Sequence, residues 1–293
     1  MVRAAVIGCG RMGAGIRVTQ APLGWEPITH TEAVLDSGFE LVGLSDVDHE
    51  KLEKHSEHYG VRGFADYREM LKTVKPDLVT IATRADERPQ IIAETARHAR
   101  MIYAEKPLAT SYAGCLDALN SGALIGYGVN RRYHATYRRA LELVRSGAIG
   151  EVTDIVAEFG RGQLFWTHAH TVDLFVMFLG CEFESAYAQI TSDDDPFVDH
   201  AVFTFSSGAR ATITRSDGCT LRIVGTGGVL TIVGDGELIQ LSTGSGYFKT
   251  HSVQRIESMQ GSTVTALTEL VQGIVSVTPK EILTGIKMLE ACL

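Results

Sequence analysis

Residues 2–13 read VRAAVIGCGRMG, an apolar run that leads directly into a glycine motif of the form GxGxxG. The run predicts a buried strand, and the glycines fall where that strand turns into a helix. The first glycine permits a tight turn, the second lets the main chain approach a pyrophosphate, and the third lets the helix pack closely on the strand. Free N–H groups at the helix start then favour phosphate. The stretch predicts a Rossmann domain with a cofactor loop made of Gly8, Cys9, Gly10, Arg11, Met12 and Gly13. A glycine turn without a ligand is the less favoured interpretation.

The next apolar run, Phe39–Asp46, ends on a carboxylate. An acidic residue at the end of the second Rossmann strand accepts hydrogen bonds from the ribose hydroxyls and repels a 2′-phosphate. Asp46 therefore favours NAD over NADP as the cofactor. The alternative is that Asp46 caps the helix that follows, and one side chain can serve both roles.

The spacing between the glycine motif and Asp46 is longer than usual. Asp46 lies 33 residues beyond Gly13, whereas about 20 are expected. Two prolines and a glycine interrupt any helix before residue 28. The capping-box pattern of Thr29–Glu32 predicts that a helix begins near His30.

Residues 14–28 are therefore predicted to form an insertion beside the cofactor. In that position Leu23 and Trp25 would supply an apolar wall of the substrate site, and His30 a polar contact. The alternative is a short helix over Gly13–Ala21, whose far end points away from the cofactor. Trp25 would then pack against the outer face of the Rossmann helices.

Short apolar runs alternate with helical patterns in the first half of the chain, which predicts a parallel sheet with crossover helices. The second half shows period-two alternation joined by short turns, which is typical of antiparallel strands with one solvated face. The fold class is thus α/β, with a Rossmann domain over residues 1–125 and an α+β domain over residues 126–293 that contains an open, largely antiparallel sheet. The predicted strands are Val2–Gly8, Phe39–Asp46, Asp77–Thr83, Met101–Ala104, Ala123–Gly128, Val152–Phe159, Ser185–Ile190, Ala201–Phe205, Ala209–Thr214, Thr220–Val224 and Val229–Val233. The predicted helical segments are Asp48–Tyr59, Tyr67–Val74, Glu87–His98, His134–Ser146, Thr167–Leu179 and Thr263–Leu293.

Composition excludes several classes of protein. The 293 residues are 45% hydrophobic and 21% charged, a balance typical of globular domains. A net charge of −8 without a basic block argues against nucleic acid or an anionic membrane as a partner. The five cysteines form no CxxC pair, so neither disulfides nor a metal site are predicted, and a reducing compartment fits. Without a signal peptide or a membrane-spanning run, the chain is predicted to be cytoplasmic, and Asp193–Asp195 reads as a solvated turn.

Four further segments share a pattern with a known family. The most specific is Ala104-Glu105-Lys106-Pro107, and the others are Asn130–Tyr133, Ser146–Val152 and His170-Thr171-Val172-Asp173 followed by Leu179-Gly180. Over nearly its whole length the chain resembles the glucose-fructose oxidoreductase/inositol dehydrogenase/MocA-like (Gfo/Idh/MocA) oxidoreductases. The resemblance implies a Rossmann domain, an open-sheet domain and an active site between them.

Lys106 is the first candidate catalytic residue. It follows a predicted Rossmann strand, and loops at the carboxyl ends of such strands face the cofactor crevice. Its ammonium can hydrogen-bond a substrate oxygen and stabilise developing alkoxide charge, while Glu105 can orient it. From the residues alone, the alternative is a surface Glu-Lys pair before a turn, which is common in any chain. The resemblance favours the catalytic role and places Glu105 and Lys106 beside the cofactor.

The segment Thr83–Arg88 departs from the family, which usually has Thr-Pro-Asn here and a histidine at the position of Arg88. The resemblance still implies that Thr83 and Arg84 border the nicotinamide. Arg84 and Arg88 either bind an anionic substrate group in fork geometry or are solvated charges paired with their acidic neighbours.

His170 is the second candidate catalytic residue, because a histidine can relay the proton that accompanies hydride transfer. Asp173, three residues on, shares its helix face. Trp166 and His168 stand where family members often have aspartate and glycine, so the usual aspartate–histidine pair is missing. Which of His168 and His170 carries the proton stays open. The alternative for His168 is a capping residue, and the alternative for His170 is a satisfied, half-buried histidine.

The predicted reaction is reversible, NAD(H)-dependent hydride transfer to or from a secondary alcohol or ketone of a sugar or cyclitol derivative. Predicted substrate contacts come from Arg132, Tyr133, Trp166, Asp173 and Trp25. One rival is reduction of a conjugated C=C or C=N bond, as in biliverdin-reductase-like relatives, and another is a non-catalytic NAD sensor. The resemblance also implies a homo-oligomer, a dimer or a tetramer, since the second-domain sheet often makes such contacts.

Overall fold

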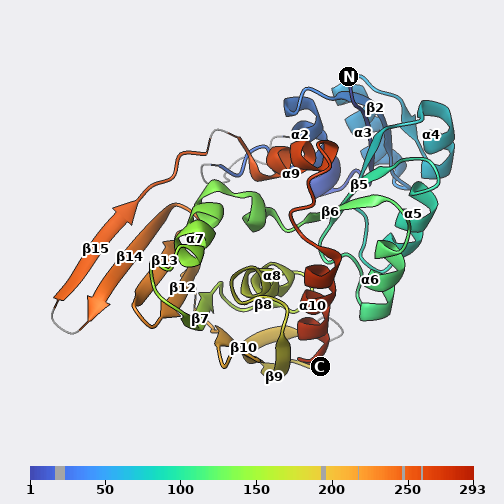
Figure 1. Cartoon of the computed structure of the whole chain (residues 1–293). Helices are drawn as coiled ribbons and strands as arrows, with labels where there is room; N and C mark the ends of the chain where they lie inside the picture. Colours follow the sequence, from blue (N-terminus) through green and yellow to red (C-terminus); the bar gives the residue numbers. More distant parts are fainter. Residues whose placement is uncertain (17–23, 193–195, 217, 246–247, 259) are drawn as a thin grey trace. The chain divides into compact units, whose positions relative to one another are not determined.

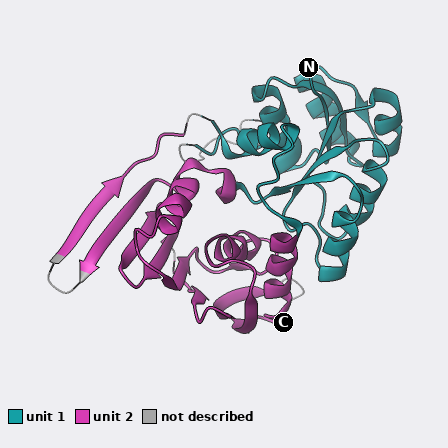
Figure 2. Cartoon of the chain, in the orientation of Figure 1, with its two compact units in different colours: residues 1–130, 259–279 teal, residues 131–258, 280–293 magenta. Residues whose placement is uncertain are grey.

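The computed structural model describes residues 1–16, 24–192, 196–216, 218–245, 248–258 and 260–293. It divides into two compact units (Figure 2). The first comprises Met1–Asn130 and Met259–Pro279, and the second Arg131–Ser258 and Lys280–Leu293. The predicted boundary after residue 125 lies five residues before this junction, whereas the segment 259–279, which we assigned to the second domain, groups with the first unit. Leu23 and Asp193–Asp195 lie outside the described residues.

Six described strands of the first unit form a parallel sheet in the order β3-β2-β1-β4-β5-β6 (Figure 1). This is the strand order of a doubly wound Rossmann sheet, so the predicted fold class is confirmed. The central strands are almost wholly apolar because helices cover both faces of such a sheet. The strands are β1 (Arg3–Ile7), β2 (Glu40–Ser45), β3 (Gly63–Phe64), β4 (Leu78–Ile81), β5 (Met101–Glu105) and β6 (Leu124–Gly128).

Side-chain caps begin most of the helices of this unit. Asp48, Asp66 and Ser111 each accept a hydrogen bond from a main-chain N–H of the first turn, which satisfies a donor that the helix itself leaves open. The helices are α1 (Arg11–Ala14), α2 (His30–Asp36), α3 (His49–Tyr59), α4 (Tyr67–Val74), α5 (Arg88–Thr95), α6 (Tyr112–Leu119) and α9 (Ser262–Val271). None of the described helices is long and apolar enough to cross a membrane.

The predicted helical block Thr263–Leu293 was wrong as a single element. It splits into α9 and α10 (Pro279–Glu290), because Gly273 adopts a left-handed φ of 79° and Pro279 can only begin a helix, not continue one. α9 packs on β5, β6 and α2. The end of the chain therefore contributes a helix to the Rossmann unit.

The first Rossmann helix is divided between α1 and α2. α1 ends at Ala14, and α2 begins at His30 with Thr29 as its N-cap, whose hydroxyl accepts from the Glu32 N–H. The Thr31 hydroxyl donates to the Gly13 carbonyl at 2.9 Å, an acceptor that an uninterrupted helix would satisfy with the N–H four residues on. The predicted capping box is confirmed, and no helix over Gly13–Ala21 is found in the described residues.

The described strands of the second unit form a mixed sheet in the order β15-β14-β13-β12-β7-β11-β10-β8, with β9 paired to β10. Most pairs are antiparallel, as predicted, but β7 and β11 run parallel. The strands are β7 (Val152–Glu158), β8 (Gly162–Gln163), β9 (Phe183–Ile190), β10 (Phe197–Phe205), β11 (Arg210–Ile213), β12 (Thr220–Gly225), β13 (Gly228–Val233), β14 (Leu238–Ser245) and β15 (Phe248–Gln254). The other elements of this unit are the 3₁₀ helix η1 (Asn130–Tyr133), α7 (Ala135–Arg145), α8 (His168–Leu179) and most of α10.

The strand register gives this sheet two different faces. One transverse row is buried and apolar, and it consists of Ala201, Ile213, Ala157, Leu221, Ile232 and Ile239. The next row, which points to the opposite face because side chains alternate, consists of Tyr187, Val202, Thr212, Val156, Arg222, Thr231, Gln240 and Val253. We call this second row the outer row; its ends, Tyr187 and Val253, are 62% and 63% exposed.

Candidate active site

The glycine loop between β1 and α1 is shaped by close main-chain contacts. A Cβ added at Gly13 would lie 1.7 Å from the Gly8 carbonyl oxygen, and one at Gly8 would lie 2.8 Å from the Ala82 oxygen. A Cβ at Gly10 would meet nothing within 4 Å. Gly8 and Gly13 are therefore needed for packing, while the space over Gly10 suits a pyrophosphate.

Cys9, inside this loop, belongs to the core. Its thiol donates to the Ser45 carbonyl at 3.8 Å, and burial, with the nearby Asp46 charge, raises the pKa of Cys9 to about 12. The thiol is therefore protonated at neutral pH and unreactive.

Asp46 binds the glycine loop from the end of β2. Its Oδ2 accepts from the Cys9 N–H at 2.6 Å and its Oδ1 from the Asp48 N–H at 2.8 Å. Each carboxylate oxygen has capacity for a further donor, such as a ribose hydroxyl. The N-cap of α3 is Asp48, so the alternative that Asp46 caps this helix was wrong.

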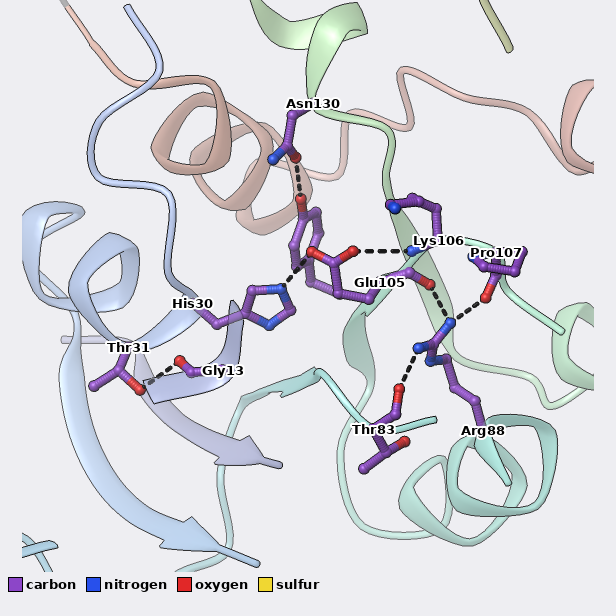
Figure 3. Close-up of polar contacts among 10 residues, drawn as sticks. Gly13, His30, Thr31, Thr83, Arg88, Glu105, Lys106, Pro107 and Asn130 are labelled. Atoms are coloured by element: carbon purple, nitrogen blue, oxygen red, sulfur yellow. Dashed lines mark hydrogen bonds and ion pairs between the residues drawn. The ribbon is translucent and has the colours of Figure 1, made fainter. Parts of the chain in front are cut away.

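Glu105 ends β5 in a buried polar cluster beneath Lys106 (Figure 3). Its Oε1 lies 3.2 Å from His30 Nε2, and its Oε2 accepts from the Lys106 N–H at 3.2 Å. The His30 ring also meets the Tyr103 ring edge to face, and the Tyr103 hydroxyl donates to Asn130 Oδ1 at 3.0 Å. Burial acts to raise the pKa of Glu105, but the His30 hydrogen bond and the charges of His30, Lys106 and Arg88 hold it below its usual value. Glu105 is therefore an ionised, fixed group.

Arg88 and Arg84 have different environments. Arg88 is 2% exposed, and its guanidinium donates to the carbonyls of Glu105, Pro107 and Thr83. The Arg84 side chain is exposed and ion-paired to Asp86 at 3.4 Å. Neither of the two interpretations offered for the pair fits Arg88, since its donors are directed at main-chain oxygens rather than at solvent or an acidic neighbour.

Two arginines of η1 are fixed by ion pairs in the second unit. Arg131 donates to both carboxylate oxygens of Asp235 at 2.7 Å. Arg132, which is buried, donates through Nε to Asp173 at 2.9 and 3.0 Å and through Nη1 to Glu281 at 2.6 Å. These contacts lock the turn that carries Tyr133, which is itself buried.

The residues around the start of α8 differ in accessibility. Trp166 is 55% exposed, His170 is half-buried and His168 is completely buried. His168 Nδ1 lies 3.2 Å from the Thr171 hydroxyl, and burial, with the Arg131 charge, lowers the pKa of His168 to about 4. His168 is therefore a neutral structural histidine at neutral pH.

Several residues that shape the site were not predicted. Three side-chain pairs join positions that are far apart in the sequence: His30 with Glu105, Asp235 with Arg131, and Glu281 with Arg132. The capping box did place His30 at a helix start, but nothing local indicated its partner. Among the described residues, no group of three or more histidine, cysteine, aspartate or glutamate side chains is arranged to hold a metal ion.

Comparison with known proteins gives a match for the Rossmann part of the chain. Residues 2–121 match the model of an oxidoreductase family with an NAD-binding Rossmann fold. This part of the chain, about two fifths of it, is thus similar to the Gfo/Idh/MocA oxidoreductases. This match confirms the predicted resemblance.

Relatives and solved structures extend the comparison. Inositol 2-dehydrogenase 3 of Saccharopolyspora erythraea is 26% identical over 154 residues, which cover 51% of this chain and 42% of that protein. The chain thus spans about two fifths of that relative's length. An NAD-binding oxidoreductase from Klebsiella pneumoniae superposes with a TM-score of 0.78 at 19% identity, over 99% of this chain and 96% of that one. A 3-ketoreductase from Actinomadura kijaniata, solved with TDP-benzene and NADP, does so with a TM-score of 0.76 at 18% identity over 99% and 96%. At these identities the likeness establishes the fold of both units.

The buried neutral state of His168 predicts a pH dependence of stability. Its pKa in the folded chain, about 4, lies below the unfolded value of about 6.5, so the unfolded state binds the proton more readily. Stability is therefore lost as the pH falls from 6.5 to 4, by about 3 kcal/mol from this residue. In urea titrations between pH 6.5 and pH 4, the free energy of unfolding of His168→Gln should fall by about 3 kcal/mol less than that of the unmodified chain. His98→Gln, which changes an exposed histidine, is the matched control. Parallel curves of unfolding free energy against pH for His168→Gln and the unmodified chain would contradict the assignment.

Proposed function

We propose that this protein is an NAD(H)-dependent oxidoreductase that transfers hydride between the nicotinamide and a secondary alcohol or ketone of a sugar or cyclitol derivative. The observation that carries the proposal is the placement of Lys106. It follows β5 at the carboxyl edge of a Rossmann sheet, and a buried carboxylate and a buried guanidinium hold its main chain. That edge is where ligands of such sheets bind.

The residues that would hold the cofactor are Gly8–Gly13, Asp46, Thr83, Arg84, Glu105 and Lys106. The open space over Gly10 and the free capacity of the Asp46 carboxylate support this assignment. When bound, the nicotinamide accepts or supplies the hydride. The preference for NAD over NADP rests on the negative charge of Asp46, which opposes a 2′-phosphate.

Lys106 would act on the substrate oxygen. Its ammonium donates a hydrogen bond to that oxygen and stabilises the charge that develops on it as the C–H bond breaks. His170 would take the hydroxyl proton in oxidation and return it in reduction. The half-buried position of His170, beside the fully buried and neutral His168, supports this choice of relay.

The proposed substrate site comprises Trp166, Tyr133, Arg132, Asp173 and Trp25. The exposed ring of Trp166 is suited to the apolar face of a sugar or cyclitol ring. Arg132 and Asp173 are paired to each other, so they would act by holding Tyr133 and the start of α8 rather than as free charges. Inositol dehydrogenase and 3-ketoreductase relatives support a polyol or its ketone as the substrate class.

We also propose that the protein works in the cytoplasm as a homo-oligomer. In the described part of the chain none of the five cysteines forms a disulfide, which suits a reducing compartment. The outer row crosses the sheet with valine, threonine and tyrosine side chains around one arginine. A second copy of the chain would cover this face, because a two-fold axis pairs one surface with itself and would bury the exposed side chains of Tyr187 and Val253.

Replacing Lys106 tests the reaction. NAD+ is first screened against a panel of polyols, and reduction is followed by absorbance. Lys106→Ala should lower kcat about 10²–10³-fold, because one donor to the developing oxyanion is lost, while the Kd of NADH changes little. Wild-type turnover by this variant would rule out Lys106 as the polarising group.

Replacing Asp46 tests the cofactor preference. NADH should bind more tightly than NADPH in titrations of nicotinamide fluorescence, since a 2′-phosphate would meet the Asp46 carboxylate. Asp46→Ser should narrow the ratio of the two Kd values. Equal or tighter NADPH binding by the unmodified chain would contradict the preference.

Charging the outer row tests the oligomer. Light scattering should give the unmodified protein a mass of two or more times the mass of a single chain. The double variant Tyr187→Lys, Val253→Lys should shift the protein towards the single chain, because it places like charges in a self-complementary interface. Leu116→Lys, which changes an exposed apolar residue of α6, is the control. A single-chain mass for the unmodified protein at micromolar concentration would disprove the oligomer.

A further inference from the structure

Arg88 is unusual among the charged residues of the first unit because its guanidinium is buried against main-chain oxygens. It is the first residue of α5, and the N-cap residue before it, Glu87, makes no side-chain cap. The side chain is 2% exposed. Burial lowers the pKa of Arg88, and the Glu105 charge opposes this. Such a group is costly to bury unless its donors are satisfied.

The acceptors of this guanidinium lie on two different loops (Figure 3). Nη1 donates to the Glu105 carbonyl at 2.6 Å and to the Pro107 carbonyl, and Nη2 donates to the Thr83 carbonyl. Glu105 and Pro107 are the two neighbours of Lys106 in the chain, while Thr83 follows β4. β4 and β5 are adjacent in the sheet, so one side chain ties together the two turns at their carboxyl ends.

We propose that Arg88 is a positioning residue for Lys106: its guanidinium fixes the main chain on both sides of the lysine and ties it to the Thr83 turn. The inference rests on the proposed role of Lys106. The planar guanidinium matches the task because its amino groups point at separate oxygens in fixed directions, which an ammonium cannot do. Lys106 is held from the other side as well, through its N–H to Glu105 Oε2 and from there to His30.

The functional consequence is a fixed direction for the Lys106 Cα–Cβ bond, which limits the positions that its ammonium can reach. When the peptide units on both sides are fixed, the side chain leaves the main chain in one direction. A misplacement of about 1 Å at a reacting group costs about 10²-fold in rate. Arg88 itself touches neither substrate nor cofactor in this account. Most of the proposed cofactor contacts, Gly8–Gly13 and Asp46, lie outside the turns that Arg88 holds, so its loss should lower kcat more than it changes the affinity for NADH.

Hydrogen–deuterium exchange of the full chain tests the positioning without substrate or cofactor. In Arg88→Met and Arg88→Lys, exchange in peptides covering residues 83–86 and 104–109 should rise about tenfold or more, because the buried charge-assisted hydrogen bonds are lost. Arg88→Lys keeps the charge and is the milder change for folding. Met70→Ala is the stability control, since Met70 is fully buried in α4. It should raise exchange in α4 and β2 while leaving residues 104–109 unchanged.

Steady-state kinetics of the same variants test the consequence. Both Arg88 variants should lower kcat about 10- to 100-fold, with the Kd of NADH changed less than about threefold, whereas Met70→Ala keeps kcat. Unchanged exchange at 104–109, wild-type behaviour of Arg88→Lys, or a loss of kcat no larger than that of Met70→Ala would overturn the inference. If Lys106→Ala keeps wild-type turnover, the proposed reaction fails instead, and exchange still decides whether Arg88 holds the turn.

Discussion

The contact between Gly13 and the Gly8 carbonyl is the constraint on which the rest of the first unit depends. A Cβ at Gly13 would stand 1.7 Å from that oxygen, so α1 approaches β1 more closely than any other residue would permit. The approach keeps the Gly8–Gly13 loop tight enough for Asp46 to reach the Cys9 N–H from the neighbouring strand. One glycine thereby sets both the shape of the phosphate loop and the position of the carboxylate expected to bind ribose.

Gly13 also helps to stabilise the first Rossmann helix, which is interrupted after α1. α1 has only four residues, too few to hold together by its own hydrogen bonds. Thr31 supplies the missing donor to Gly13, and α2 then packs beside α1. On the segment that leads into α2, the Gly24 carbonyl accepts hydrogen bonds from both the N–H and the hydroxyl of Ser262. A Cβ at Gly261 would lie 2.2 Å from the Glu26 oxygen. The start of α9 therefore anchors the segment that leads into α2, which is why residues 259–279 group with the first unit.

Local patterns in the sequence were sufficient for the fold, and for those parts of the site that follow directly from a strand end. Apolar runs and glycines located β1, β2, β4 and β5, and with them the glycine loop, Asp46 and Lys106. The capping box located α2. β14 and β15 were missed, since their many serine, threonine and glycine residues weaken the alternation on which strand prediction relies. The partners of Glu105, Arg131 and Arg132 could not be predicted, because each pair joins positions at least 40 residues apart and charge pairing carries no sequence period.

The buried charges around Lys106 follow a common physical rule. An ionised Glu105 is stable in the interior only because His30, Arg88 and Lys106 bring positive charge or donors to it. For Arg88, three carbonyls and the Glu105 charge replace part of its water, while its buried Nε has no hydrogen-bond partner. Removing any one member leaves a buried charge with less compensation, and such losses can be larger than the worth of the pair itself. The cluster is therefore cooperative, and the main chain at Lys106 is held by the balance of these charges rather than by apolar packing.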